Sequence, residues 1–234
     1  MPVEVYLEVA PKRAFAGAID WPGWCRAGRS DDDALEALLA YGPRYANAIR
    51  GTRIAFSPPK QRRTLRVVER LEGDATTDFG APSIAPKADA RSIDRRWLTR
   101  QEKLLRASWA ALDRAVDRVR GPLAKGPRGG GRELDAIVRH VVGAEASYLR
   151  MIGGTPPPFD EAEAAAARAV AAIAVRERER AAVIDTLERA LTDGIPERGP
   201  KGGARWSAPY FVRRAAWHVL DHAWEIEDRS SRSR

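Results

Sequence analysis

Apolar residues in the second part of the chain recur every three or four positions across four separate segments, and this spacing limits the fold more than any other feature. The four segments are residues 92–120, 132–153, 160–194 and 208–229. This spacing places the apolar side chains along one side of an α-helix, and each helix must bury that side against a neighbour. Four such helices are expected to form a bundle, with Ser92 as the N-cap of the first.

The first seventy residues alternate between apolar and polar types, as β-strands with one buried face do. Residues 3–10 (VEVYLEVA) and 14–21 (AFAGAIDW) flank a short turn and predict a hairpin, with Tyr6 and Glu8 on its more polar face. Further strands are expected at residues 25–28, 52–57 and 64–73. A helix is expected after Ser30, a favourable N-cap that is followed by three aspartates, with Leu35 and Leu38 in its buried stripe.

The change of pattern predicts two domains of different class. Residues 1–72 are expected to form an α+β domain and residues 92–234 an all-α four-helix bundle. Between them, residues 73–91 lack periodicity and are rich in Gly, Pro, Ala, Ser and Thr, which indicates a linker. A second stretch of this kind, residues 121–132, is expected to be a mobile loop between two helices.

Composition and charge exclude several classes of function. The net charge is +8, but arginines alternate with acids on the predicted helices, which is typical of a solvated surface and does not favour nucleic-acid binding. No apolar stretch is long enough to span a membrane, and the chain start has no leader pattern, so we expect a cytoplasmic protein. The single cysteine, Cys25, is expected to be buried and not nucleophilic, because its domain contains no histidine. Phosphate-loop, dinucleotide and Gly-x-Ser-x-Gly motifs are absent from the sequence.

All three histidines of the chain lie in two of the predicted helices: His140 in one, His218 and His222 in the last. The last two are one helical turn apart, and each of the three falls at the edge of its helix's apolar stripe. Three imidazoles from facing helices can hold a divalent ion and leave a coordination position open for water or substrate. The alternative is that each histidine merely borders the core and makes one hydrogen bond.

The context of these histidines, RHVVGAEASYL and RRAAWHVLDHAWEIEDR, resembles the second and fourth helices of the DinB/YfiT-like four-helix bundle family. The resemblance covers residues 92–229. It implies that His140, His218 and His222 are the metal ligands, and that the ion is a divalent transition metal such as Ni, Zn, Fe or Mn. It also implies a metal-dependent transferase that uses a low-molecular-weight thiol, or an isomerase or hydrolase.

Residues 1–70 resemble the HicB-like fold through the stretch PGWCRAGRSDDDALEALLAYGPRYANAI. The chain departs from that pattern at Trp24, and no DNA-binding helix-turn-helix or ribbon-helix-helix segment is attached. The resemblance therefore implies a partner-binding or regulatory module and not an operator-binding antitoxin.

Other residues are weaker candidates for the chemistry. Glu145, Glu225 and Tyr148 are candidates for transferring protons or supporting the metal ligands, and Arg213 and Arg214 are candidates for binding an anionic substrate. Two hypotheses stay open. In one, a bacterial metalloenzyme of transferase or hydrolase type acts on a small molecule. In the other, a non-enzymatic regulatory protein has a structural or sensory metal, or none. Trp217 and Trp224 fall outside the predicted stripe of the last helix and are expected to meet the first domain or a partner chain, which would permit a homodimer.

Overall fold

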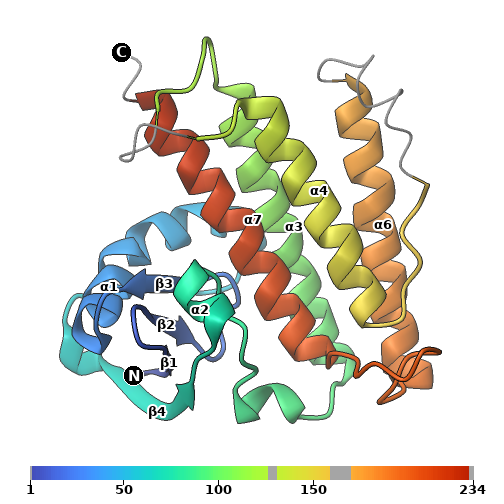
Figure 1. The fold of residues 1–234 in the computed structure, drawn as a ribbon, viewed down its shortest axis with the longest axis horizontal. Coiled ribbons are helices and arrows are strands. Elements are labelled where there is room, and N and C mark those ends of the chain that lie inside the picture. Colours follow the sequence, from blue (N-terminus) through green and yellow to red (C-terminus); the bar gives the residue numbers. More distant parts are fainter. Residues whose placement is uncertain (1, 126–130, 159–169, 232–234) are drawn as a thin grey trace.

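The computed structural model describes residues 2–125, 131–158 and 170–231, and it has the expected fold class. An N-terminal α+β part with a four-stranded sheet precedes a helical region with four main helices (Figure 1). Among the described residues, no helix is both long and apolar enough to cross a membrane.

The sheet contains β1 (Val3–Val9), β2 (Ala14–Ala18), β3 (Cys25–Gly28) and β4 (Leu65–Glu72) in the order β3-β2-β1-β4. The predicted hairpin is confirmed, because β1 and β2 pair antiparallel. β3 extends the sheet antiparallel to β2, whereas β4 pairs parallel to β1 on the other side.

The strand predicted at residues 52–57 is wrong. Arg53 adopts a left-handed conformation with φ 59°, which interrupts an extended chain at its start. The apolar residue Phe56 packs instead in an aromatic cluster, with its ring centroid 4.6 Å from Trp21 and 5.2 Å from both Trp24 and Tyr45. The alternation of apolar residues here therefore reflects burial of side chains and not pairing of a strand.

Helix α1 (Asp31–Ala48) covers one face of the sheet. Ser30 is its N-cap as predicted, and the Ser30 hydroxyl accepts a hydrogen bond from the Asp33 amide at 3.1 Å. Leu35 and Leu38 pack against the apolar residues of β1 and β2.

The other face of the sheet is also buried, which the strand pattern did not predict. Tyr6 and Glu8 are both buried, because residues 73–91 and the last helix cover them. The Glu8 carboxylate accepts hydrogen bonds from the Thr77 hydroxyl and from the amides of Ser83 and Ile84. The expected linker thus contains two short helices, α2 (Ala75–Phe79) and η3 (Lys87–Ala90), and it supplies the groups that make a buried carboxylate tolerable.

The four main helices are α3 (Arg95–Asp117), α4 (Leu134–Met151), α6 (Val170–Asp193) and α7 (Ala208–Ser231). Asp94 and not Ser92 caps α3: the Asp94 carboxylate accepts from the Trp97 amide at 2.6 Å, and its negative charge suits the helix N-terminus better than a hydroxyl two residues earlier. Part of the expected loop at 121–132 and the beginning of the expected helix at 160–194 lie outside the described residues.

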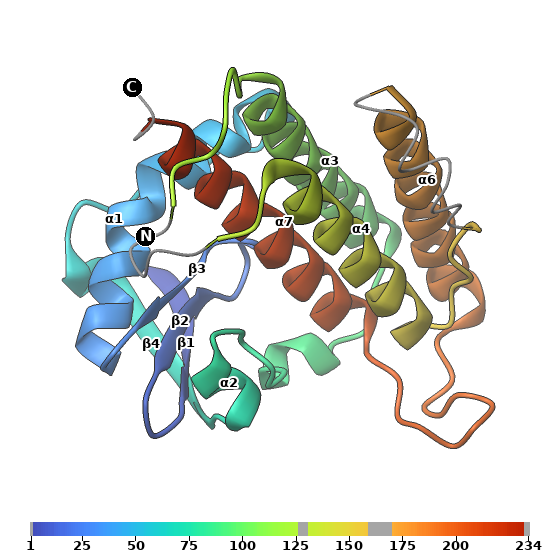
Figure 2. The ribbon, with the colours of Figure 1, turned by 45° about the horizontal axis from the view of Figure 1, so that its top comes forward.

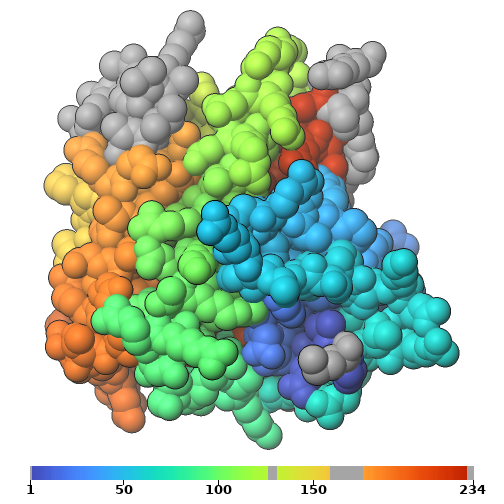
Figure 3. All heavy atoms as spheres, turned by 180° about the vertical axis from the view of Figure 1, so that it is seen from behind, coloured from blue at the N-terminus to red at the C-terminus, as the bar shows by residue number. Residues whose placement is uncertain are grey.

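Helix α7 lies between the N-terminal part and the other helices in both ribbon views (Figures 1 and 2). Ala215, Val219 and Ala223 pack into the core of the bundle. Residues on another side of α7 belong to the N-terminal cores: Trp217 packs with Phe15 and Cys25, and Leu220 and Trp224 pack with residues of α1. Viewed from behind, the N-terminal part lies directly against α3 (Figure 3). Helix α7 therefore belongs to the cores of both parts of the chain.

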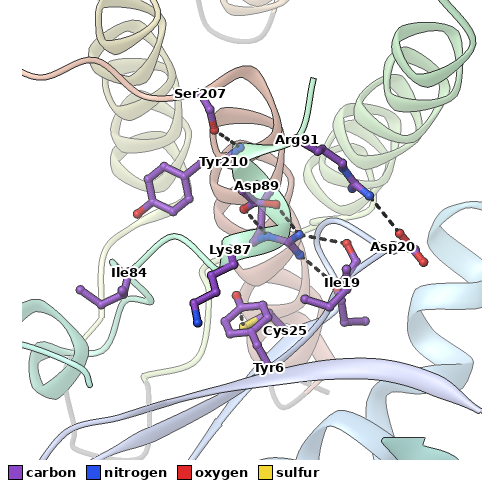
Figure 4. A network of polar contacts seen from close by, with 12 residues as sticks. Tyr6, Ile19, Asp20, Cys25, Ile84, Lys87, Asp89, Arg91, Ser207 and Tyr210 are labelled. Carbon is purple, nitrogen blue, oxygen red and sulfur yellow. Dashed lines mark hydrogen bonds and ion pairs between the residues drawn. The ribbon is translucent and has the colours of Figure 1, made fainter. Parts of the chain in front are cut away.

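A buried ion pair joins α7 to the N-terminal part. The Arg213 guanidinium donates to both Asp89 carboxylate oxygens at 2.7 Å, and also to the backbone oxygens of Ala18 and Ile19 at 2.7 and 2.9 Å. Asp89 and Ile19 gather here with Tyr6 and Cys25 (Figure 4). Asp89 is 1% and Arg213 6% exposed, so these hydrogen bonds satisfy two charged groups that are buried away from water.

Candidate metal-binding site

The three histidines come together between α4 and α7. The Nε2 atoms of His140 and His218 are 3.1 Å apart. The ring centroid of His140 lies 5.0 Å from those of both His218 and His222, and the latter two centroids are 4.7 Å apart. One ligand atom from each residue lies within 4.8 Å of the others, so the group could hold a metal ion.

The geometry of the helices and the burial of the side chains determine where these rings lie. His218 and His222 are one turn apart on α7, so their side chains project from the same side of that helix. His218 is 6% and His222 9% exposed, whereas His140 on α4 is half-buried. The cluster therefore lies at the edge of the core, as its position beside the apolar stripes predicted.

Glu225 orients His222. Its Oε2 lies 2.8 Å from Nδ1 of His222, and its Oε1 accepts from Nη1 of Arg229 at 2.9 Å. The pKa of Glu225 is lowered, first by the hydrogen bond from His222, so the carboxylate stays ionised. A proton held on Nδ1 leaves the Nε2 lone pair of His222 free for a ligand, which is the usual arrangement in carboxylate-histidine-metal sites.

The remaining histidines are held in a different way. Nδ1 of His218 is buried and has no hydrogen-bond partner among the described residues, so the ring is held by the hydrogen bond between its Nε2 and Nε2 of His140 and by neighbouring aromatic rings. The Tyr148 and Trp217 rings lie 5.7 and 6.1 Å from the His218 ring. Burial is the first cause that lowers the pKa of both His140 and His218, and neighbouring positive charges lower both further. Both imidazoles are therefore neutral near pH 7, the form that can donate a lone pair.

The observed spacing suits a tetrahedral ion. Two imidazole nitrogens bound at about 2.0–2.1 Å to one zinc ion are roughly 3.3 Å apart. The separation of 3.1 Å between the Nε2 atoms of His140 and His218 is close to this value. One ligand atom of His222 lies within 4.8 Å of those of the other two histidines. The residues present thus fit an ion with three protein ligands and an open position.

The other candidate residues divide into two groups. Tyr148 and Arg214 lie next to His218: Cζ of Arg214 is 5.4 Å from the Tyr148 ring centroid. Glu145 is bonded elsewhere, because its Oε1 accepts from the Trp109 indole at 2.6 Å, and Arg213 is bonded to Asp89.

Arg229, which anchors Glu225, was not among the residues predicted from the sequence. The sequence does contain a signal for this contact. Arg229 follows Glu225 by four residues in the same predicted helix, and side chains of opposite charge at that spacing can pair.

Glu145 belongs to a separate polar cluster between α3, α4 and α6. Burial raises the pKa of Glu145 to about 7 and that of Glu179 to about 7. In the same cluster Arg180 binds Asp113 through two hydrogen bonds of 2.7 and 2.9 Å. Glu145 itself is 4% exposed, so this cluster lies in the interior of the helical region.

We expect Glu145→Gln to stabilise the protein above pH 7 but not near pH 4.5. Between its ordinary value of 4.5 and about 7, the folded protein retains a proton that the unfolded chain loses, so Glu145 lowers stability as pH rises. The full difference corresponds to about 3 kcal/mol at most. The amide oxygen of the introduced glutamine can still accept from Trp109. Urea unfolding at pH 5 and pH 8 measures the effect, and Glu102→Gln, which alters a surface pair with Arg106, should show almost none. A stabilisation that is the same at both pH values would contradict the assignment.

A cavity of about 630 Å³ lies elsewhere, at the end of α3 and the C-terminal end of α7. Its lining includes Leu123, Glu227 and Ser230 but none of the three histidines. The candidate site is therefore identified by its metal-binding side chains and not by the size of a cavity.

Comparisons with known proteins add no family to this description. No protein-family model matches the chain, and neither a curated protein nor a solved structure matches it significantly.

Proposed function

We propose that the protein binds one divalent transition metal ion through His140, His218 and His222 and acts on a small molecule as a metal-dependent transferase of the thiol S-transferase type or as a hydrolase. The convergence of the three imidazoles within 4.8 Å carries this proposal. The resemblance of residues 92–229 to DinB/YfiT-like bundles supports it, and so does the fit of the nitrogen spacing to one ion.

Several residues around the proposed metal site have separate roles. A divalent ion in such a site lowers the pKa of a bound thiol or water and so supplies a nucleophile near neutral pH. Glu225 holds the proton on Nδ1 of His222 and thereby keeps its Nε2 available. Tyr148 and Trp217 exclude water from the His218 ring and fix its direction. Burial raises the pKa of the Tyr148 phenol, which therefore stays protonated and can donate a hydrogen bond to a substrate.

A specific observation favours a second candidate, a regulatory protein with a structural or sensory metal. The carboxylates proposed for proton transfer are already bonded, Glu145 to Trp109 and Glu225 to His222 and Arg229. In that case the HicB-like part would bind a protein partner.

Metal content and turnover distinguish the two candidates. We expect protein purified without chelators to contain about one transition metal ion per chain. We expect it to accelerate the reaction of a chlorinated aromatic electrophile with at least one of bacillithiol, mycothiol and glutathione, or the hydrolysis of an activated ester. His222→Ala should lose both the metal and the turnover. Metal without turnover on any of these substrates would favour the regulatory protein, and absence of metal together with no binding at micromolar concentration would overturn both.

A further inference from the structure

The polar residues on one side of α7 extend beyond the histidines toward the beginning of the helix. Arg214 precedes His218 by four residues, just as His218 precedes His222. Residues four apart lie on the same side of a helix, about 6 Å apart along its axis. The Arg214 side chain is therefore one helical turn from the histidine cluster.

Two aromatic rings hold Arg214 beside His218. Cζ of Arg214 lies 4.7 Å from the Trp217 ring centroid and 5.4 Å from that of Tyr148. The same two rings contact His218. A guanidinium that stacks on aromatic faces keeps its N–H groups, which lie in its own plane, available for a planar anion such as a carboxylate.

The Arg214 guanidinium has no acceptor among the described residues. Its Nη1 is buried and makes no hydrogen bond. The preceding residue differs sharply, because Nε, Nη1 and Nη2 of Arg213 all donate to Asp89 or to backbone oxygens. Arg229, further along α7, likewise donates to the backbone oxygens of Ala124 and Arg132. A buried donor without an acceptor is unfavourable, so a ligand that supplies an acceptor here gains affinity.

The surrounding charges also favour an anion. The acidic residue bonded to the histidine cluster, Glu225, is already paired with His222 and Arg229. A divalent ion at the histidines would add further positive charge.

We propose that Arg214 is a specificity-determining residue that binds the carboxylate of a small substrate or thiol cofactor whose reactive atom lies at the three histidines. This inference rests on the proposed metal site. It identifies the substrate class as small molecules that carry a carboxylate in addition to the atom that binds the metal, placed so that side chains from neighbouring turns of α7 reach both groups.

Two thiols of equal chain length test this assignment on the full-length protein loaded with Co²⁺. The probes are 3-mercaptopropionate, which carries a carboxylate, and 3-mercapto-1-propanol, which does not. Thiolate binding to cobalt is followed by the sulfur-to-cobalt absorption band. We expect wild-type protein to bind the acid about 10- to 100-fold more tightly than the alcohol, as expected for a charge-assisted bidentate contact. Arg214→Gln should reduce this ratio to about one and leave the affinity for the alcohol unchanged.

Arg139→Gln is the matched control, because Arg139 is exposed on α4 and its replacement removes the same charge. This variant should keep the wild-type ratio. An equal loss in both variants, or a wild-type ratio near one, would overturn the role of Arg214. Binding of cobalt without binding of either thiol would also overturn it, whereas failure to bind cobalt at all would overturn the metal site itself. Cobalt stoichiometry, measured on the same samples, separates these results.

Discussion

His140→Ala is expected to lower the affinity of the protein for Zn²⁺ by about 100- to 1,000-fold. Structural zinc sites bind with about 10–16 kcal/mol shared among four ligands, so each ligand contributes roughly 2.5–4 kcal/mol. His140 is the cleanest of the three histidines to replace, because it is half-buried and lies within a helix that tolerates alanine. Competition with a chromophoric chelator measures the affinity.

Two further variants make this result specific. Arg139→Ala changes the adjacent, exposed residue and should leave the affinity unchanged. Glu225→Gln should lower it by about 10- to 100-fold, because Glu225 orients His222 without occupying a ligand position. Equal affinities of His140→Ala and Arg139→Ala would mean that the three rings do not bind a common ion.

The position of the three histidines at the edge of the core could be predicted from the sequence because it depends on local geometry. That all three bind one ion is what the family resemblance implies, and it stays a prediction. The spacing of His218 and His222 fixes them on one side of a helix, and their position beside the apolar stripe predicts an edge of the core. To place His140 beside the other two histidines, the prediction needed only that its helix faces the last helix. The tilt of the rings and the bond between Glu225 and Arg229 depend on rotamers, which a sequence pattern does not specify.

The joint between the two parts could not be predicted in the same way. An amphipathic pattern identifies one buried stripe, but α7 is buried on several sides, since Trp217 and Trp224 pack against the N-terminal part. Both tryptophans fall outside the predicted stripe and were expected to meet the first domain or a partner chain, and contact with the N-terminal part is confirmed. Asp89 lies in a segment without periodicity, 124 residues from its partner Arg213, so no local signal reports the pair. The domain boundaries at residues 72 and 92 stay a prediction.

Asp89→Ala is expected to reduce the free energy of unfolding by about 3–5 kcal/mol, because it leaves the Arg213 guanidinium buried without a counter-charge. The double variant Asp89→Ala with Arg213→Met removes both charges and should be more stable than Asp89→Ala alone. Urea unfolding followed by circular dichroism and tryptophan fluorescence measures these differences. We expect one transition in both signals, since α7 contributes to the cores of both parts.

Asp20→Ala is the matched control, because Asp20 pairs with Arg91 in the same region but its side chain is 62% exposed. A surface pair of this kind contributes at most about 1 kcal/mol. If Asp89→Ala were no more destabilising than Asp20→Ala, the backbone oxygens of Ala18 and Ile19 would suffice to hold Arg213. If the double variant were the least stable, the pair would contribute net stability. Only the expected order, with Asp89→Ala least stable, agrees with a charge whose burial depends on its partner.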